Sequence, residues 1–354
     1  MAPPARLPRY RTGNRDLDAK ISDLLDEVGV ERDRDQLFEI IATAVRLAGD
    51  KADRLDLKIT NAALKEMRAA FRTFAPYSHI PKVTMFGSAR THPDDPLYAQ
   101  ARSMAKVLAD HGWMVVTGAG PGIMAAGMEG AGRDMSFGVT IRLPFENEPN
   151  PVIAGDKKLV SMKYFFTRKL MLIKESAGFV ALPGGFGTLD EVFELLTLEQ
   201  TGKADPVPIV LLEVPGGTYW RAWDDFITKE VGARGLVSPD DSSLFLVTDD
   251  VAAAAQAITG FYRNYHSRRF VGDEMVVRLR SAPTDDELAQ LNERFANILT
   301  SGVIRHTEAF PEERATDDHV DLPRIAFHFD RLSHGRLREL IDALNALPSA
   351  PAGP

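Results

Sequence analysis

The 354-residue sequence contains no cysteine, which excludes disulfide-stapled scaffolds, thiol nucleophiles, iron–sulfur clusters and cysteine-ligated zinc. Long apolar runs are also missing. The best stretch, residues 170–182, is interrupted by Lys174 and Glu175 and falls short of the roughly 20 residues that cross a bilayer. The opening residues, MAPPARLPRY, lack the apolar segment of a secretion signal. We therefore expect a cytoplasmic protein without a membrane partner.

Basic residues are outnumbered, since the chain carries 42 Lys and Arg against 50 Asp and Glu and has a formal net charge of −8. Nucleic-acid-binding proteins usually show the opposite balance, so we expect no nucleic-acid partner. The eight histidines show no metal-ligand spacing such as H-E-x-x-H, and we expect no metal site. Hydrophobic residues make up 44% of the chain, and its length fits two domains or one large α/β domain with attachments.

Three regions of the sequence differ in pattern. Residues 1–80 are charge-dense, with apolar residues at helical spacing, and predict a helical extension of two or three helices after a mobile start of about fifteen residues. In residues 81–262, short β-rich runs alternate with helical stretches. The runs that predict strands are residues 83–87, 113–118, 136–143, 178–185, 206–214 and 244–247. The stretches that predict helices are residues 96–111, a segment from about 121, 164–175, a segment from 188, 219–231 and 250–261.

This alternation predicts the fold class. Strands that are apolar almost throughout belong to a parallel sheet covered on both faces, a doubly wound Rossmann-like α/β fold. Ligands of such folds bind beyond the C-terminal ends of the strands. The residues that follow each predicted strand are therefore the first candidates for function.

Residues 263–346 predict a separate small α+β module. We expect strands at 275–280, near 303 and at 324–329, and helices at 284–298 and 335–344. Residues 308–321 are interpreted as an acidic loop, and residues 347–354 as a disordered tail. By analogy of fold, an effector site or an oligomer contact is the expected role of the module.

Two glycine-containing turns follow predicted strands. Gly87-Ser88 lets a ligand approach the backbone, although a plain turn has the same composition. Gly118, Gly120 and Gly122 lie between a strand and a helix, where N–H groups and the helix dipole favour an anion, and tight packing of helix on strand is the alternative. Ile123 stands where the dinucleotide fingerprint needs glycine, and no Walker lysine follows. NAD binding and ATP hydrolysis are therefore not expected.

The run PGGFGTLDE at residues 183–191 joins a predicted strand to a predicted helix. Its glycines leave the N–H groups of Gly185, Gly187 and Thr188 open to a phosphate, and Glu191 falls one turn further on. Thr188-x-x-Glu191 is also a capping box, in which Glu191 would only accept a hydrogen bond from the Thr188 N–H. That alternative does not account for the glycines.

Arg168 lies on the predicted helix that precedes this strand, in the run SMKYFFTRK at residues 161–169. A guanidinium there could fork onto phosphate oxygens or assist a departing base. A solvated basic helix face is the alternative.

These motifs resemble those of a known family. PGGFGTLDE matches the P-G-G-x-G-T-x-x-E signature of the LONELY GUY (LOG) family, long misnamed "lysine decarboxylase". The run with Met162, Arg168 and Lys169 is similar to the family's second motif, except that Lys163 stands where the family often has histidine. TGAGPGIMAAGMEGA and VTIRLPFENEPN are similar to the longer bacterial members, and the resemblance covers about residues 80–262.

The resemblance implies hydrolysis of the N-glycosidic bond of AMP or an N6-substituted AMP, which yields the free base and ribose 5-phosphate. It implies no cofactor, and a homodimer or higher homo-oligomer. By carry-over, Arg168 and Glu191 are the catalytic pair. The residues expected to bind the substrate and its phosphate are Gly87, Ser88, Gly118, Gly120, Gly122, Met162, Lys169, Pro183, Gly184, Gly185, Gly187 and Thr188.

Two other functions compete with this one. A protein that binds a nucleotide or the molybdenum cofactor without turnover needs only the phosphate loop, whereas Arg168 together with Glu191 favours an enzyme. A true lysine decarboxylase needs pyridoxal phosphate on a lysine, with an acidic partner for the ring nitrogen. Lys169 and Lys174 lie on a charged helix that offers no such context.

Overall fold

The computed structural model describes residues 8–142 and 149–352 of the chain. Two units, Met1–Met67 and Arg68–Pro354, each pack within themselves. Three of the expectations lie partly outside the described residues. These are residues 1–7 of the expected mobile start, residues 143–148 of the run VTIRLPFENEPN, and residues 353–354 of the expected tail. The last residue of the predicted strand 136–143 also lies outside.

In the first unit, α1 (Arg15–Glu27) and α2 (Arg34–Gly49) pack against each other. Asn14 caps α1, because its side chain accepts hydrogen bonds from the N–H groups of the first turn. The apolar cluster shared by the two helices consists of Ile21, Leu25, Phe38 and Ala42. Helix α3 (Arg54–Phe74) begins in this unit and ends in the second.

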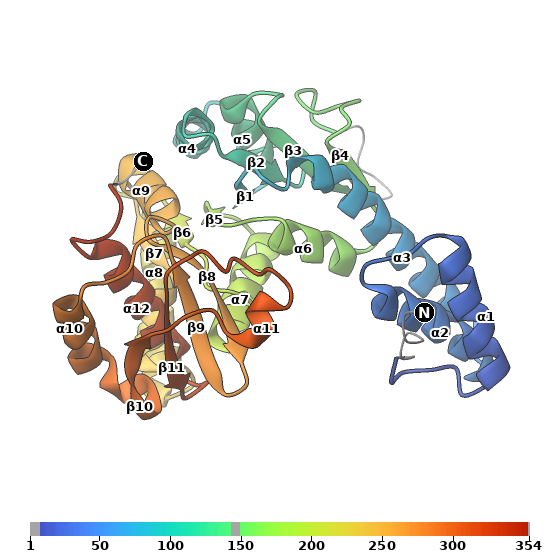
Figure 1. The fold of residues 1–354 in the computed structure, drawn as a ribbon. Coiled ribbons are helices and arrows are strands. Elements are labelled where there is room, and N and C mark those ends of the chain that lie inside the picture. The colour runs from blue at the N-terminus through green and yellow to red at the C-terminus, as the bar shows by residue number, and fades with distance from the viewer. Residues whose placement is uncertain (1–7, 143–148, 353–354) are drawn as a thin grey trace. The chain divides into compact units, whose positions relative to one another are not determined.

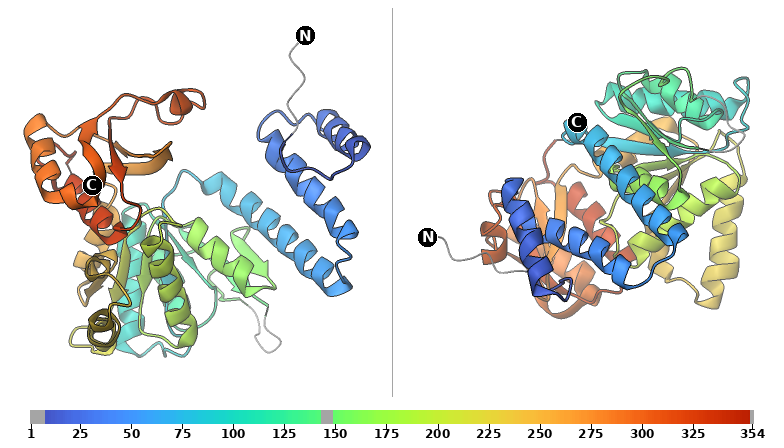
Figure 2. Two further views of the ribbon diagram at one scale, coloured as in Figure 1. Left: turned by 90° about the horizontal axis from the view of Figure 1, so that it is seen from below. Right: turned by 90° about the vertical axis from the view of Figure 1, so that its right-hand side faces the viewer.

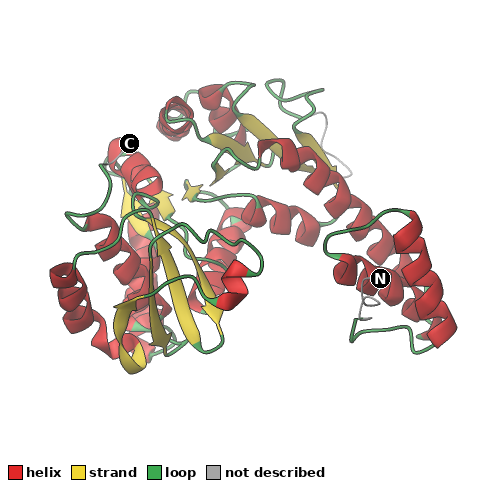
Figure 3. Cartoon of the chain, in the orientation of Figure 1, coloured by secondary structure: helices red, strands yellow, loops and turns green. Residues whose placement is uncertain are grey.

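The second unit contains a seven-stranded sheet in the order β4-β3-β2-β1-β5-β6-β7. Its strands are β1 (Lys82–Phe86), β2 (Met114–Thr117), β3 (Ser136–Ile141), β4 (Leu159–Met162), β5 (Phe179–Ala181), β6 (Ile209–Leu212) and β7 (Leu246–Thr248). Every neighbouring pair is parallel. The predicted Rossmann-like α/β fold is confirmed (Figures 1 and 3).

Helices cover both faces of this sheet. The α-helices between β1 and the end of this α/β region are α4 (Pro96–Asp110), α5 (Ile123–Ala131), α6 (Phe165–Lys174), α7 (Phe186–Gln200), α8 (Tyr219–Phe226) and α9 (Val251–Gly260). Apolar side chains of α4, α5 and α9 pack on Val83 and Met85 of β1. Thr84, between them, points to the other face, where its hydroxyl donates to the Leu172 carbonyl of α6 over 2.9 Å.

The sheet order places the candidate site. The chain moves outward from β1 through β2, β3 and β4, then crosses back to β5 on the other side of β1. The crevice at such a reversal, beyond the C-terminal ends of β1 and β5, is where ligands of open α/β sheets bind. The two loops that leave these strands touch, because the Ser88 N–H donates to the Pro183 carbonyl over 3.2 Å.

Two elements differ locally from the prediction. Strand β4 is absent from the prediction, since its apolar run is only four residues long and includes Ser161, and it lies at the edge of the sheet. The helix predicted at 219–231 ends at Phe226 and continues as a π-helical turn, Ile227–Val231. The next short helices are η3 (Gly232–Arg234) and η4 (Pro239–Leu244).

The C-terminal part of the second unit holds a four-stranded antiparallel sheet in the order β10-β11-β9-β8, drawn in orange and red in Figure 2. Its elements are β8 (Tyr265–Val271), β9 (Glu274–Leu279), α10 (Asp285–Phe295), β10 (Leu299–His306), α11 (Pro311–Arg314), β11 (Arg324–Phe329) and α12 (His334–Ala346). β8 is missing from the prediction because YHSRRFV is rich in polar and charged residues, as edge strands often are. In the segment expected to be a disordered tail, the Ser349 N–H donates to Glu287, and Arg263 donates to the Pro351 carbonyl.

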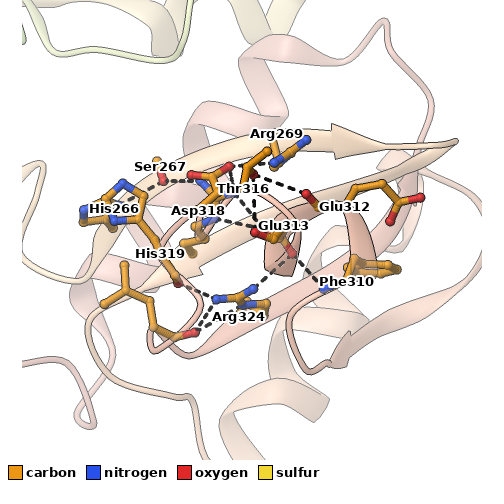
Figure 4. Close-up of polar contacts among 12 residues, drawn as sticks. His266, Ser267, Arg269, Phe310, Glu312, Glu313, Thr316, Asp318, His319 and Arg324 are labelled. Carbon is orange, nitrogen blue, oxygen red and sulfur yellow. Dashed lines mark hydrogen bonds and ion pairs between the residues drawn. The ribbon is translucent and has the colours of Figure 1, made fainter. Parts of the chain in front are cut away.

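The segment interpreted as an acidic loop is tied into this sheet (Figure 4). Glu313 of α11 is fully buried and accepts from Arg278 over 2.6 Å and from Arg324 over 3.0 Å. Asp318 extends the network to Arg269 over 2.6 Å. The interpretation of this segment as a loop is wrong at Glu313, which belongs to the short helix α11 and is buried against Arg278 of β9 and Arg324 of β11.

Candidate active site

A cavity of about 860 Å³ opens where the loops after β1 and β5 meet. It gathers most of the predicted site. The predicted residues that line it are Gly87, Ser88, Gly118, Arg168, Gly184, Gly185, Gly187, Thr188 and Glu191. Both members of the expected catalytic pair therefore face one cavity, which is a requirement for their acting on one ligand.

The capping-box alternative for Thr188 and Glu191 is wrong. Helix α7 begins at Phe186, after an N-cap at Gly185, so Thr188 already lies inside the first turn. The Thr188 N–H donates to the Gly185 carbonyl over 3.0 Å and not to a Glu191 oxygen. The expectation that this N–H is open to a phosphate is therefore wrong, although Thr188 lines the cavity. The carboxylate of Glu191 therefore needs another explanation.

Glycine at positions 185 and 187 has no packing reason. A Cβ at either position would meet no atom of the described residues within 4 Å, and the φ of Gly185 is an ordinary −85°. Both residues are exposed at the N-terminus of α7, where the N–H groups that precede Thr188 lie too early in the helix for the usual intrahelical acceptor. Glycine at these positions leaves the backbone accessible at the N-terminus of α7, where the helix dipole is positive and favours an anion.

The other glycines of the loops have packing reasons. A Cβ at Gly87 would lie 2.5 Å from Ile123, and a Cβ at Gly184 would lie 2.2 Å from the Thr188 hydroxyl. Gly122 has a φ of +65° and faces the Ser88 carbonyl, which would be 2.2 Å from its Cβ. Ile123 thus fills the space beside Gly87, so its departure from the dinucleotide fingerprint serves packing between helix and strand.

Glu191 has an unusual environment. Its Oε2 is buried and has no hydrogen-bond partner among the described residues. Burial raises the pKa of Glu191 to about 7, and the charges of Lys169 and Arg168 offset only part of that rise. A carboxyl group poised near neutral pH can exchange protons during a reaction.

Arg168 is held in place from two sides. Its Nε donates to the Val139 carbonyl over 3.0 Å. A Cβ at Gly118 would lie only 2.0 Å from its Nη2, so the guanidinium occupies the space that glycine leaves open. The residue is half-buried and lines the cavity, which does not fit the alternative of a solvated basic face.

Some predicted residues lie elsewhere. Gly120 and Gly122 line a neighbouring cavity of about 630 Å³, which shares Ala89 and Arg90 with the first. Within the described part of the chain, Met162, Lys169 and Pro183 line neither of these cavities. Met162 and Pro183 are buried.

Lys169 forms ion pairs of 2.6 Å with Asp190 and with Glu194. Burial would lower the pKa of Lys169, but its hydrogen bonds to these two carboxylates hold it above the ordinary value. A lysine that forms a Schiff base needs a lowered pKa, so Lys169 does not suit pyridoxal phosphate. As for metals, the described residues include no group of three or more His, Asp or Glu side chains that could hold an ion.

Several residues that line the 860 Å³ cavity were not predicted from the sequence. The Tyr219 hydroxyl donates to the Gly184 carbonyl over 2.6 Å and so braces the glycine loop. Phe165 and Phe186 stand at the cavity with 62% and 92% of their surface exposed. Phe186 was within reach of prediction, because it occupies the variable position of the signature. Tyr219 was not, because it lies 35 positions from its partner in the chain.

Comparison with known proteins agrees with the motifs. A family model described as "Possible lysine decarboxylase" matches residues 121–258. The cytokinin riboside 5'-monophosphate phosphoribohydrolase of Mycobacterium marinum is 30% identical over 175 residues, which are 48% of this chain and 88% of that protein. This chain belongs to the LONELY GUY family. The residues that the family model matches in this LOG-family chain include Arg168, the glycine loop after β5 and Glu191.

Other relatives of the LOG-family chain match over less of their length. The Arabidopsis thaliana enzyme LOG1, named for the same activity, is 35% identical over 118 residues, 33% of this chain and 52% of that protein. The chain thus spans about half of that curated relative. Among solved structures, the molybdenum cofactor carrier protein MCP of Chlamydomonas reinhardtii is similar at 25% identity and a TM-score of 0.36, over 50% of this chain and 95% of that one.

No helix in the two described ranges combines the length and the apolar character needed to cross a membrane.

Proposed function

We propose that this protein hydrolyses the N-glycosidic bond of a nucleoside 5'-monophosphate, AMP or an N6-substituted AMP, and releases the free base and ribose 5-phosphate. The observation that carries the proposal is that an open glycine loop, the Glu191 carboxyl group and the Arg168 guanidinium line one cavity. The name of the Mycobacterium marinum relative supports the same reaction class.

The 5'-phosphate is assigned to the N-terminus of α7. Gly185 and Gly187 expose their backbone there without any packing need, and Thr188 lines the same place. N–H groups at a helix N-terminus bind phosphate well, because they point at the ligand along the helix dipole. Holding the phosphate supplies binding energy remote from the reacting bond and positions C1′ of the ribose.

Glu191 and Arg168 are assigned to the bond that breaks. Departure of the base leaves positive charge on the ribose, as in other glycosyl transfers. The ionised Glu191 carboxylate stabilises that charge and accepts a proton from the attacking water, whose oxygen forms the new bond to C1′. The electron pair of the C1′–N bond leaves with the base, and the Arg168 cation stabilises the negative charge that develops there.

A substrate panel tests the reaction. Purified protein incubated with AMP is expected to release adenine and ribose 5-phosphate in equal amounts, followed by liquid chromatography. Adenosine, which lacks the phosphate, is expected to react far more slowly at equal concentration, because it gains nothing from the α7 N-terminus. If AMP and the other common nucleoside monophosphates bind but no base appears, the protein is a binder without turnover, and the proposal is wrong.

The rate should also depend on pH in a defined direction. Since the ionised form of Glu191 is the active one and its pKa lies at about 7, kcat/KM for AMP is expected to rise as pH increases through about 7. Lys169→Met removes a charge that lowers this pKa, so the midpoint should move to higher pH. Lys174→Met removes a lysine of the same helix that is paired with Glu175, and should leave the midpoint in place. A midpoint that stays fixed in Lys169→Met, or moves equally in both variants, would contradict the assignment to Glu191.

A further inference from the structure

The Tyr219 side chain reaches the glycine loop from a different element of the fold. Tyr219 is the first residue of α8, and its hydroxyl donates to the carbonyl of Gly184, the residue before the N-cap of α7. It is half-buried and lines the 860 Å³ cavity. The steps assigned to Glu191 and Arg168 do not use this hydroxyl, so its hydrogen bond needs its own explanation.

The position of Tyr219 is well fixed. The N–H of the next residue, Trp220, donates to the buried Glu213 carboxylate over 3.1 Å. A Cβ at Gly217 would lie 2.2 Å from Glu213 Cγ, so this carboxylate is packed closely under the turn before α8. The Tyr219 ring lies edge-on to the ring of Trp220, which is fully buried, with the centroids 4.8 Å apart. The hydroxyl is therefore held by a well-packed part of the second unit.

The hydrogen bond to Gly184 also determines where the Gly185 N–H points. The Gly184 carbonyl and the Gly185 N–H belong to one planar trans peptide unit, in which the two groups point in opposite directions. The Gly185 N–H therefore points away from the acceptor atom that Tyr219 holds. Within the described ranges it donates to no backbone carbonyl, and Gly185 is exposed at the cavity. This N–H is thus available to an anion at the N-terminus of α7.

The same peptide unit is unusually free to turn over, because it joins two glycines. A peptide flip rotates the φ of the following residue by about 180°. The φ of Gly185 would change from −85° to a positive value, which glycine adopts readily. The Gly184 carbonyl oxygen would then point to the side where the N–H was, and its partial negative charge would repel a phosphate. Gly184 cannot be replaced to prevent this, since a Cβ there would meet the Thr188 hydroxyl.

We propose that Tyr219 is a positioning residue for the substrate phosphate. Its hydroxyl holds the Gly184–Gly185 peptide in the orientation that presents the Gly185 N–H to the anion, and prevents the flip that would present a carbonyl oxygen instead. The inference rests on the proposed function, because it takes the α7 N-terminus as the site of the 5'-phosphate.

Tyr219→Phe tests the proposal, since it keeps the ring and removes only the hydroxyl. The probe is ribose 5-phosphate, which carries the phosphate but has no base to lose. Its dissociation constant, from calorimetric titration, is expected to rise roughly tenfold, as for the loss of one hydrogen bond to a charged group. The KM for AMP should rise by the same factor, and kcat should change less than about threefold. The kcat/KM for adenosine, which has no phosphate, should stay unchanged.

Tyr262→Phe is the matched control. The Tyr262 hydroxyl also donates to a backbone carbonyl, that of Ala177 over 2.9 Å, and Tyr262 does not line the 860 Å³ cavity in the described structure. Its loss should leave ribose 5-phosphate binding and the KM for AMP as they are in the unmodified protein.

A double-mutant cycle with Gly185→Ala tests the flip itself. The new Cβ meets no described atom within 4 Å, and alanine disfavours the positive φ that the flipped peptide needs. With the flip disfavoured in this way, adding Tyr219→Phe should weaken ribose 5-phosphate binding less than about threefold, whatever Gly185→Ala does alone. A general loosening of α8 would not depend on the residue at position 185.

Several results would overturn the proposal. They are unchanged ribose 5-phosphate binding in a folded Tyr219→Phe variant, an equal proportional loss for adenosine, an equal loss in Tyr262→Phe, and the same tenfold loss in the Gly185→Ala background. A Tyr219→Phe protein that no longer folds, as judged by thermal unfolding, would assign the hydroxyl to stability. If the unmodified protein releases no base from AMP, the proposed reaction is wrong, and the ribose 5-phosphate titrations still decide the role of Tyr219.

Discussion

Glu191→Gln is expected to lower the rate of AMP hydrolysis by roughly 10²- to 10⁴-fold, the range over which a positioned acid or base usually contributes. Glutamine keeps the size of the side chain but carries no charge and accepts no proton from water. AMP binding should change little, because the phosphate is assigned to the α7 N-terminus. The thermal midpoint should not fall either, since Glu191 does not cap α7 and its Oε2 makes no hydrogen bond within the described chain. Base release, calorimetric titration with AMP and thermal unfolding measure the three quantities.

Glu194→Gln is the control for this experiment. Glu194 lies three positions along the same helix, pairs with Lys169, and does not line the cavity in the described structure. Its loss should leave most of the activity. Similar rates in the two variants would remove Glu191 from the mechanism, and a Glu191→Gln protein that no longer folds would assign the residue to stability.

Gly118→Ala is expected to reduce AMP hydrolysis roughly 100-fold while leaving the fold intact. The new Cβ would lie 2.0 Å from Arg168 Nη2 and 2.7 Å from Met124 Sδ. Both are ends of flexible side chains, so they can move aside at little cost to stability. The guanidinium would then leave its place in the cavity, and a displacement of about 1 Å in a catalytic group is enough for a loss of this size.

A double-mutant cycle shows whether this loss passes through Arg168. In an Arg168→Ala background the guanidinium that the new Cβ would displace is already gone, so adding Gly118→Ala should change the rate little further. If the two losses multiply instead, Gly118 acts independently of Arg168, by contact with the ligand or by an effect on the strand end. The thermal midpoints of all three variants distinguish either result from unfolding.

Most strands of the parallel sheet could be predicted because strands buried on both faces are largely apolar, as β6 is along its whole length and β1 is at three of its five residues. The two edge strands β4 and β8 were not predicted, β4 because it has only four residues and β8 because most of its residues are polar or charged. Ion pairs between residues on different elements were not predicted either. The burial of Glu313 depends on Arg278 and Arg324, and nothing in the local sequence reveals partners on neighbouring strands.

At the site, the signature PGGFGTLDE could be recognised from the sequence because its residues are contiguous. The physical reasons for the glycines of the site could not be predicted from the sequence. Gly118 is glycine because of Arg168, which lies fifty positions away, whereas Gly185 and Gly187 meet nothing within reach in the described structure. Only the three-dimensional structure distinguishes a glycine that avoids a clash from one that leaves space for a ligand. The capping box failed as an interpretation for a similar reason: it depends on the residue at which α7 begins, and helix ends are poorly fixed by sequence.

Helix α7 ties three parts of the protein together. Its first turn borders the 860 Å³ cavity, and its second half borders a cavity of about 540 Å³ that Trp223 also lines. Glu199 in its last turn accepts from the Val207 N–H, and the Val207 carbonyl accepts from Arg338 of α12. At fifteen residues it is about 22 Å long, and it is hydrogen-bonded along its length. Because Glu191 and Glu199 belong to this one continuous helix, we expect a substitution that displaces Glu199 or its partner Val207 to alter the position of Glu191 as well.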